Sequence, residues 1–308
     1  MGDMKTGGID WARILPFTVG LLLLGPWRVL TPYAGYELIV HGYPYTGATL
    51  LAVGIPITAA CFLLALPPAW ARRWALRHSL DLNRLGHVTA LLILLLVFLY
   101  LLGNALSSFA YGFEANALPT QITGFQLVRM GVANLLCMGG GAIAYTRLVQ
   151  GKNLRQTMYL LKVKRRGQKL IAILLGVAAA FLLLLLILVI SLLLDSLGIA
   201  PENPVGIEIV SAMTPVLIIL IPVLAAVSEE LFFRGFLQSH IGLWGSAALF
   251  GIVHLGYGNW LQVAMPFIFG LAWGLLLHWS DDLAAPITSH FVYDFVALGM
   301  AWMAIACV

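Results

Sequence analysis

The residues best suited to chemistry lie in the last third of the chain, inside segments that are otherwise hydrophobic. Six ionisable residues stand out there: Glu229, Glu230, Arg234, His254, His290 and Asp294. After Lys169 the chain has no Lys or Arg other than Arg234. An ionisable side chain inside a membrane costs at least about 2.5–3.5 kcal/mol on insertion scales, so its presence indicates a function. These six residues define the candidate site.

Glu229 and Glu230 begin the stretch EELFFR, which ends at Arg234. Glu230 and Arg234 are four residues apart with the acid first, the order that favours an ion pair on one face of a helix. Glu229 is turned about 100° away from Glu230, because an α-helix has 3.6 residues per turn. We therefore expect Glu230 and Arg234 to support the site and Glu229 to be free for catalysis.

Two further pairs have the same spacing. Phe250 lies four residues before His254, and His290 lies four residues before Asp294. Residues at this spacing share a helical face, so the Phe250 ring should lie beside the His254 imidazole as a supporting contact. We expect His290 and Asp294 to enter the same site about one and two turns inside the last helix.

The depth of Glu229 and His254 follows from the turn between their helices. If Ile207–Gln238 is one helix and the chain reverses near Ile241–Gly242, each residue lies about 12 residues from the turn. At about 1.5 Å per residue, both should lie roughly 18 Å from it, level with each other. Three segments would then send polar side chains into one cavity within the last four helices.

A carboxylate beside an imidazole can activate water. Glu229 and His254 could hold a water molecule and remove its proton as it attacks a carbonyl carbon. His290 and Asp294 could donate hydrogen bonds to the oxyanion that forms. The pattern predicts hydrolysis by activated water, with these four residues as the catalytic set.

Other chemistries fit the residues less well. A serine nucleophile is not expected, because Ser228 and Ser289 are sequence neighbours of the key residues, and helical neighbours do not face one another. Zinc held by Glu229, His254 and His290 is an alternative, although the sequence lacks HExxH. A transporter or proton relay also uses intramembrane Glu and His, but no inverted repeat is apparent.

The composition predicts an all-α, polytopic integral membrane protein. The chain has 308 residues, of which 61% are hydrophobic and 10% charged, and its mean hydropathy is +0.96. A helix of about 20 apolar residues spans a bilayer. We expect eight or nine spans, near Trp11–Leu30, Thr46–Leu66, Val88–Tyr111, Gly124–Tyr145, Leu170–Leu194, Ile207–Val227, Leu243–Leu255, Trp260–Trp279 and Ala285–Ala306.

The cations alternate between loops. Four arginines lie between residues 72 and 84 and eight cations between Arg147 and Lys169, whereas Thr31–Tyr45, Gly112–Thr123 and Asp195–Val205 hold none. By the positive-inside rule the N-terminus and both basic loops are cytoplasmic, in the cell (inner) membrane if the source is prokaryotic. Leu154–Lys169 could also bind anionic headgroups of membrane lipids. Membrane orientation explains the net charge of +4, so no nucleic-acid partner is expected.

Two parts of the chain differ in charge. We expect an N-terminal transmembrane region of five spans with basic cytoplasmic loops at 1–206, and a catalytic helical core at 207–308. The first apolar stretch lacks a small-residue cleavage site and is predicted to be a retained helix. Three single cysteines (Cys61, Cys137, Cys307) suggest neither a disulfide nor a thiolate metal site. No cofactor or metal is expected.

Three motifs resemble a known family. EELFFR matches EExxxR, FGIVH at Phe250–His254 matches FxxxH, and HFVYD at His290–Asp294 matches Hxxx(N/D). Their order and spacing are similar to those of the CAAX prenyl protease type II family, also called the CAAX protease and bacteriocin-processing family. The resemblance covers about Pro215–Ala306.

The resemblance implies an intramembrane endopeptidase of the glutamate type, active without an obligatory metal. By analogy, Glu229 and His254 would activate the water, and His290 and Asp294 would line the oxyanion site. The substrate would be a peptide or protein, lipidated in the eukaryotic members that cut prenylated CAAX proteins. Many prokaryotic members act on other peptides or have no known substrate.

Asp294 departs from the pattern, because many members have Asn there. An ionised Asp cannot donate to an oxyanion, so Asp294 must either stay protonated or orient His290. A non-catalytic membrane scaffold on the same fold is the other reading of the resemblance. The complete motif set argues against a scaffold, which has no need to retain all the acids and histidines.

Overall fold

The computed structural model describes residues 122–163, 169–199, 203–257 and 259–306, together with scattered residues between 80 and 101. The chain forms two compact units, Met1–Leu99 and Tyr100–Val308, and all the candidate site residues lie in the second unit. Three expected spans lie wholly or mostly outside the described residues: Trp11–Leu30, Thr46–Leu66 and Val88–Tyr111. The arginines of the basic loop at residues 72–84 also lie outside them, so the cytoplasmic position of the N-terminus stays a prediction.

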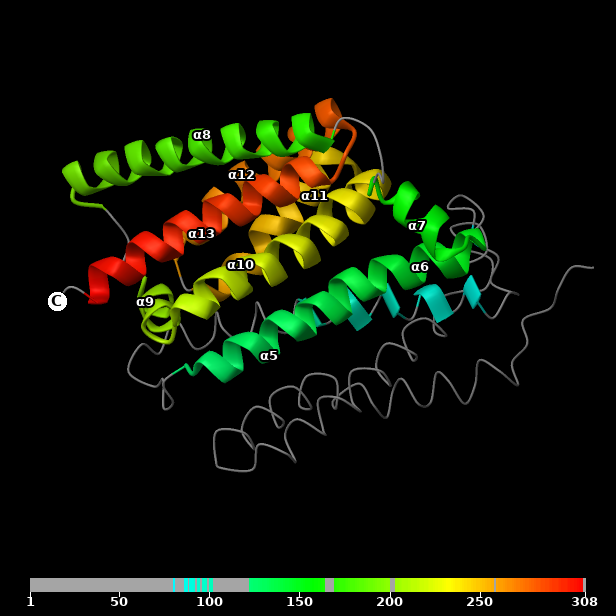
Figure 1. Ribbon diagram of the computed structural model, residues 1–308, viewed down its shortest axis with the longest axis horizontal. Helices are drawn as coiled ribbons and strands as arrows, with labels where there is room; N and C mark the ends of the chain where they lie inside the picture. Colours follow the sequence, from blue (N-terminus) through cyan, green and yellow to red (C-terminus); the bar gives the residue numbers. More distant parts are fainter. Residues whose placement is uncertain are drawn as a thin grey trace, which may run out of the picture. The chain divides into compact units, whose positions relative to one another are not determined.

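The described residues of the second unit form a bundle of helices (Figure 1). The first five elements are α5 (Gly124–Asn134), the π-helical turn η1 (Leu135–Gly139), α6 (Gly140–Gln150), α7 (Leu154–Leu160) and α8 (Lys169–Ser196). The next four are α9 (Pro204–Ser211), α10 (Pro215–Glu229), the π-helical segment η2 (Glu230–Leu237) and α11 (Gln238–Ile252). The last three are the 3₁₀ turn η3 (Val253–Tyr257), α12 (Leu261–Ser280) and α13 (Ala284–Ala306).

Four helical segments among the described residues are long and apolar enough to cross a membrane: Gly124–Gln150, Lys169–Ser196, Pro215–Leu255 and Leu261–Ser280. α13 adds a helix of 23 residues at the expected span Ala285–Ala306. The lipid interior contains no water to bond the backbone, and a helix is one of the few structures that hydrogen-bonds all its own N–H and C=O groups. The all-α membrane fold predicted from composition is confirmed, and the number of spans stays a prediction.

The expected reversal between the two motif-bearing segments is present. Gly242 interrupts α11 with φ 78° and ψ 174°, a conformation that suits glycine because it has no Cβ. The chain therefore turns at Ile241–Gly242, as the depth calculation assumed.

The expected single helix over Ile207–Gln238 is wrong at its start. α9 ends at Ser211, and α10 begins only at Pro215. The Thr214 hydroxyl accepts a hydrogen bond from the Leu217 N–H at 3.4 Å and caps α10, while Pro215 occupies the first turn, where a missing N–H costs nothing. Pro215 therefore starts a helix and is not inside one.

α8 lies alongside α13 (Figure 1). The buried residues in the first half of α8 recur at helical spacing and are mostly small: Ala172, Gly176, Ala180 and Leu183. A Cβ on Gly176 would lie 2.5 Å from the Ala285 carbonyl oxygen and 3.2 Å from the Ser289 amide nitrogen. The glycine thus lets α8 touch the backbone of α13 just before His290. The domain boundary at 206/207 stays a prediction. α8 lies before this boundary in the sequence but packs against α13, which lies after it.

α12 packs closely against α11 through the GxxxG pair Gly270 and Gly274. A Cβ on Gly270 would lie 3.0 Å from the Ala247 Cα, so the two backbones nearly touch. The Gln238 side-chain amide donates a hydrogen bond to the Gly274 carbonyl oxygen at 3.0 Å. The glycines have the packing role expected for small residues in membrane helices.

Gly176→Ala is expected to destabilise the protein by about 1–3 kcal/mol, because the new methyl group meets backbone atoms of α13 that cannot move cheaply. Gly140→Ala is the matched control, since its Cβ would approach no heavy atom more closely than the Leu135 carbonyl oxygen at 4.0 Å. The unfolding midpoints of both variants in detergent test this contact. Equal midpoints for Gly176→Ala and the unmodified protein would contradict the close approach of α8 and α13.

Candidate functional site

The motif EELFFR runs from the last residue of α10 into η2, a π-helical segment in which every residue is buried. The backbone N–H of Gln238 donates to the Phe233 carbonyl oxygen, five residues earlier. The Ser246 hydroxyl of α11 donates to the same carbonyl oxygen at 2.7 Å. π-helical turns inside α-helices are frequent at functional sites, and here the turn ties η2 to α11. The ordinary α-helical geometry assumed for the motif is therefore wrong from Glu230 onward.

Glu230 and Arg234 form the predicted ion pair. The Arg234 Nε lies 3.2 Å from the Glu230 Oε2, and both side chains are almost completely buried. The Arg234 guanidinium also lies 4.1 Å from the centre of the Phe250 ring and 5.3 Å from that of Trp273. Ring faces attract cations, so the aromatic residues help to compensate for the lost hydration of Arg234.

His290 occupies the centre of the site. Its Nδ1 lies 2.9 Å from the Glu230 Oε1, while its Nε2 lies 3.3 Å from the Asp294 Oδ2 and 4.0 Å from the Glu229 Oε2. Each ring nitrogen therefore faces a carboxylate, an arrangement that a doubly protonated imidazolium satisfies with its two N–H donors. The structure brings together four of the predicted residues, from α10, η2 and α13. The Glu230 contact was not predicted.

The three carboxylates differ in their surroundings. The Glu230 side chain is 0% exposed and contacts both Arg234 and His290. The Glu229 side chain is 15% exposed and the Asp294 side chain 25% exposed. Glu230 is thus enclosed by cationic neighbours, whereas Glu229 retains room for a further polar contact.

His254 lies in η3, directly after α11. Its Nδ1 lies 2.7 Å from the Phe250 carbonyl oxygen. A carbonyl oxygen only accepts, so the Nδ1–H is the donor, and in the neutral ring Nε2 keeps its lone pair. The imidazole stacks on Tyr257 with ring centres 5.9 Å apart and an interplanar angle of 12°.

Phe250 connects His254 to the rest of the site. Its ring centre lies 4.7 Å from that of His254 and 6.2 Å from that of His290. The predicted placement of the Phe250 ring beside the His254 imidazole is confirmed, and its supporting role stays a prediction. A water shared by Glu229 and His254 stays a prediction, since the ionic neighbour that the structure gives Glu229 is His290.

Sequence reasoning missed Trp273 and its contact with Ser289. The Trp273 ring stacks on His290, and its Nε1–H donates to the Ser289 hydroxyl at 2.9 Å. The Ser289 hydroxyl is thus engaged by Trp273, and it stays a prediction that this serine is not a nucleophile. The one signal in the sequence was the position of this tryptophan between Gly270 and Gly274, on the face that packs against other helices.

The phenylalanines of η2 pack in the core. Phe232, Phe233 and Phe236 are all buried. Among the described residues, no group of three or more His, Cys, Asp or Glu side chains is arranged to hold a metal ion.

Two comparisons with known proteins find a likeness, one of them in this region. Residues 211–296 match the model of a family described as type II CAAX prenyl endopeptidase Rce1-like. The chain is also 40% identical over 80 residues to the uncharacterized protein YpbD of Bacillus subtilis, a match that covers 26% of this chain and 42% of YpbD. The chain thus spans less than half the length of that relative. No solved structure matches the chain.

The matched residues contain all three motifs and nearly coincide with the segment that carried the resemblance. The likeness to the Rce1-like type II CAAX prenyl endopeptidase family therefore rests on residues 211–296, less than a third of the chain.

Proposed function

We propose that the chain is an intramembrane endopeptidase that hydrolyses peptide bonds near the cytoplasmic face with water activated by Glu229 and His254. The observation that carries the proposal is the contact of one buried imidazole, His290, with Glu229, Glu230 and Asp294. The family match of the same residues supports a peptidase.

Glu229 acts as the general base. Glu230 is already engaged by Arg234 and His290, so Glu229 is the neighbouring carboxylate with acceptor capacity to spare. It removes a proton from water as the water oxygen bonds to the scissile carbonyl carbon and the carbonyl π electrons move to oxygen. The same proton then passes to the amine as the C–N bond breaks.

His254 orients the water. The Nδ1–H bond to the Phe250 carbonyl oxygen fixes the tautomer, which leaves Nε2 to accept a hydrogen bond from the second water hydrogen. Because Glu229 and His254 each accept one hydrogen of the water molecule, together they fix the direction in which its lone pair points.

His290 stabilises the oxyanion. Its Nε2–H donates to the developing negative charge, a preorganised contact that needs no reorganisation during the reaction. The 3.3 Å contact between the Asp294 Oδ2 and this nitrogen favours the orienting role for Asp294 over the role of a protonated donor. The substrate is a peptide or protein, and a lipidated chain is one form that a membrane site can receive.

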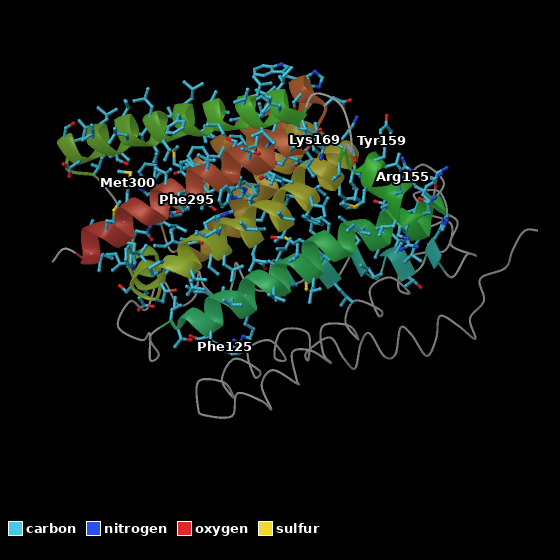
Figure 2. The ribbon with its side chains drawn as sticks, viewed as in Figure 1. Phe125, Arg155, Tyr159, Lys169, Phe295 and Met300 are labelled. Atoms are coloured by element: carbon cyan, nitrogen blue, oxygen red, sulfur yellow. The ribbon has the colours of Figure 1, made fainter. Side chains whose placement is uncertain are left out.

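Membrane lipids are the proposed partners of the surface around α7. This helix lies between α6 and α8 in the chain, and the exposed fractions of Leu154 and Tyr159 are 52% and 65%. Figure 2 marks Arg155 and Tyr159 on α7. Eight cations lie between residues 147 and 169, and no Asp or Glu occurs from residue 115 to 194. Lys162 pairs with Asp281 at 2.7 Å, and the exposed apolar side chains among the other cations fit an anionic lipid surface.

Glu229→Gln and His254→Ala are each expected to lower peptide hydrolysis by about 10²-fold or more, because proton transfer in the transition state is lost. Membrane peptides that accumulate in a deletion strain identify the substrate, and complementation with each variant measures its processing. Glu208→Gln on α9, at the opposite end of α10, is the control and should process normally. If both Glu229→Gln and His254→Ala process peptides normally, the peptidase proposal is wrong, and the scaffold and transporter alternatives remain.

Chelators are expected to leave hydrolysis unchanged, since the proposed reaction uses only side chains and water. The measurement compares cleavage rates of the purified protein with and without EDTA or 1,10-phenanthroline. Inhibition that zinc reverses would instead favour the zinc alternative with Glu229, His254 and His290 as ligands.

Replacing Lys152 and Arg155 by Gln is expected to weaken the stabilisation that phosphatidylglycerol gives the protein, because about 1 kcal/mol of lipid attraction per cation is lost. Melting temperatures in phosphatidylcholine nanodiscs with and without phosphatidylglycerol measure it. Arg129→Gln, an exposed cation on α5, is the matched control. The same lipid response in both variants would argue against a lipid contact at α7.

A further inference from the structure

Trp273 of α12 contacts His290 through its ring face. The two ring centres are 4.1 Å apart, and the ring planes differ by 16°. Both side chains are buried, and Trp273 is not part of any of the three motifs. The stacking contact is therefore an internal one, and it joins a residue outside the motifs to the centre of the site.

The contacts of His290 divide into two kinds. Glu230 and Asp294 contact its two nitrogens and hold the ring along its edges. Contacts at the edges leave the tilt of the ring less constrained, because hydrogen bonds to carboxylates tolerate a broad range of angles. The indole face opposes this tilt, since a rotated imidazole would lose the stacking contact.

A second contact fixes the neighbouring backbone. The Trp273 Nε1–H donates to the hydroxyl of Ser289, which is completely buried and precedes His290 in α13. A buried indole N–H without a partner is costly, so this bond selects one register of α13 against α12.

Trp273 is itself held in place. Its ring lies 5.9 Å from Phe250 and 5.7 Å from Phe269, centre to centre, and the Arg234 guanidinium lies 5.3 Å from it. Gly270 and Gly274 on either side of it bring α12 close to α11. The indole can therefore act as a fixed wall for His290.

We propose that Trp273 is a positioning residue: by stacking on His290 and bonding Ser289 it aims the His290 Nε2–H at the oxyanion. This role rests on the peptidase function proposed above. Trp273 touches no reacting atom, and it acts only through the orientation of the imidazole. Small errors in the placement of a catalytic group cost up to about 10²-fold in rate.

Three single variants and one double variant separate the stacking contact from the hydrogen bond. Trp273→Leu removes both and is expected to lower kcat by about 10²-fold with KM changed less than about twofold, since the transition state alone uses the aimed N–H. Trp273→Phe keeps a ring face and should recover much of this loss. Ser289→Ala removes only the bond and should match Trp273→Phe, and the double variant Trp273→Phe/Ser289→Ala should cost no more than either single variant.

The matched control is Trp302→Phe, which removes another indole hydrogen bond of the bundle, from the Trp302 Nε1 to the Met213 carbonyl oxygen at 3.1 Å. Its kcat should equal that of the unmodified protein. A loss of kcat in Trp302→Phe as large as in Trp273→Phe, or an unchanged kcat in Trp273→Leu, would overturn the positioning role.

A second readout does not need a substrate. Hydrogen exchange at the C2 position of His290, followed by mass spectrometry of the full-length protein, reports the environment of the ring. The exchange rate should change in Trp273→Leu and stay constant in Trp302→Phe. If the unmodified protein cleaves no peptide, the peptidase proposal fails, while an unchanged exchange rate in Trp273→Leu overturns the positioning proposal by itself. Should Trp273→Leu not fold, Trp273→Phe and Ser289→Ala provide the same comparisons.

Discussion

The structure depends on burying Arg234 and Glu230 together inside an apolar bundle. Either charge alone would be very costly at this depth, and the pair is tolerated only because each group has several partners. Arg234 has the Glu230 carboxylate and the faces of Phe250 and Trp273. Glu230 has Arg234 and His290. This pair fixes η2, and through His290 it also fixes α13, so the helices that carry the site are held by the charges they enclose.

Two adjacent glutamates acquire different roles from this arrangement. Glu230 is fully enclosed and contacts Arg234 and His290, whereas Glu229 is partly exposed and lies 4.0 Å from the His290 Nε2. Environment, and not residue type, separates the structural carboxylate from the proposed base. The small residues have a related function: Gly176 lets α8 approach α13, and Gly270 and Gly274 let α12 approach α11.

The sequence was sufficient for features that depend on composition and local spacing. The all-α membrane class, the reversal at Ile241–Gly242 and the Glu230–Arg234 pair follow from hydropathy, a glycine and the i,i+4 rule. It was insufficient where backbone geometry or distant contacts decide. The π-helical segment η2 is hydrogen-bonded by Ser246, thirteen residues after Phe233. The stacking of Trp273 on His290 depends on the packing of α12 against α13. No periodicity in a single segment encodes such contacts.

The proposed catalysis requires Glu229, His254 and His290 to meet around one scissile carbonyl group. An experimental structure of the Glu229→Gln variant with an uncleaved peptide bound in a lipid nanodisc tests this most directly. The account predicts the peptide carbonyl oxygen within hydrogen-bond distance of the His290 Nε2, and the substituted amide at position 229 close enough to the His254 imidazole to share one water. A separation of that amide from the imidazole beyond roughly 6 Å, two hydrogen-bond lengths, or a peptide bound elsewhere would contradict it.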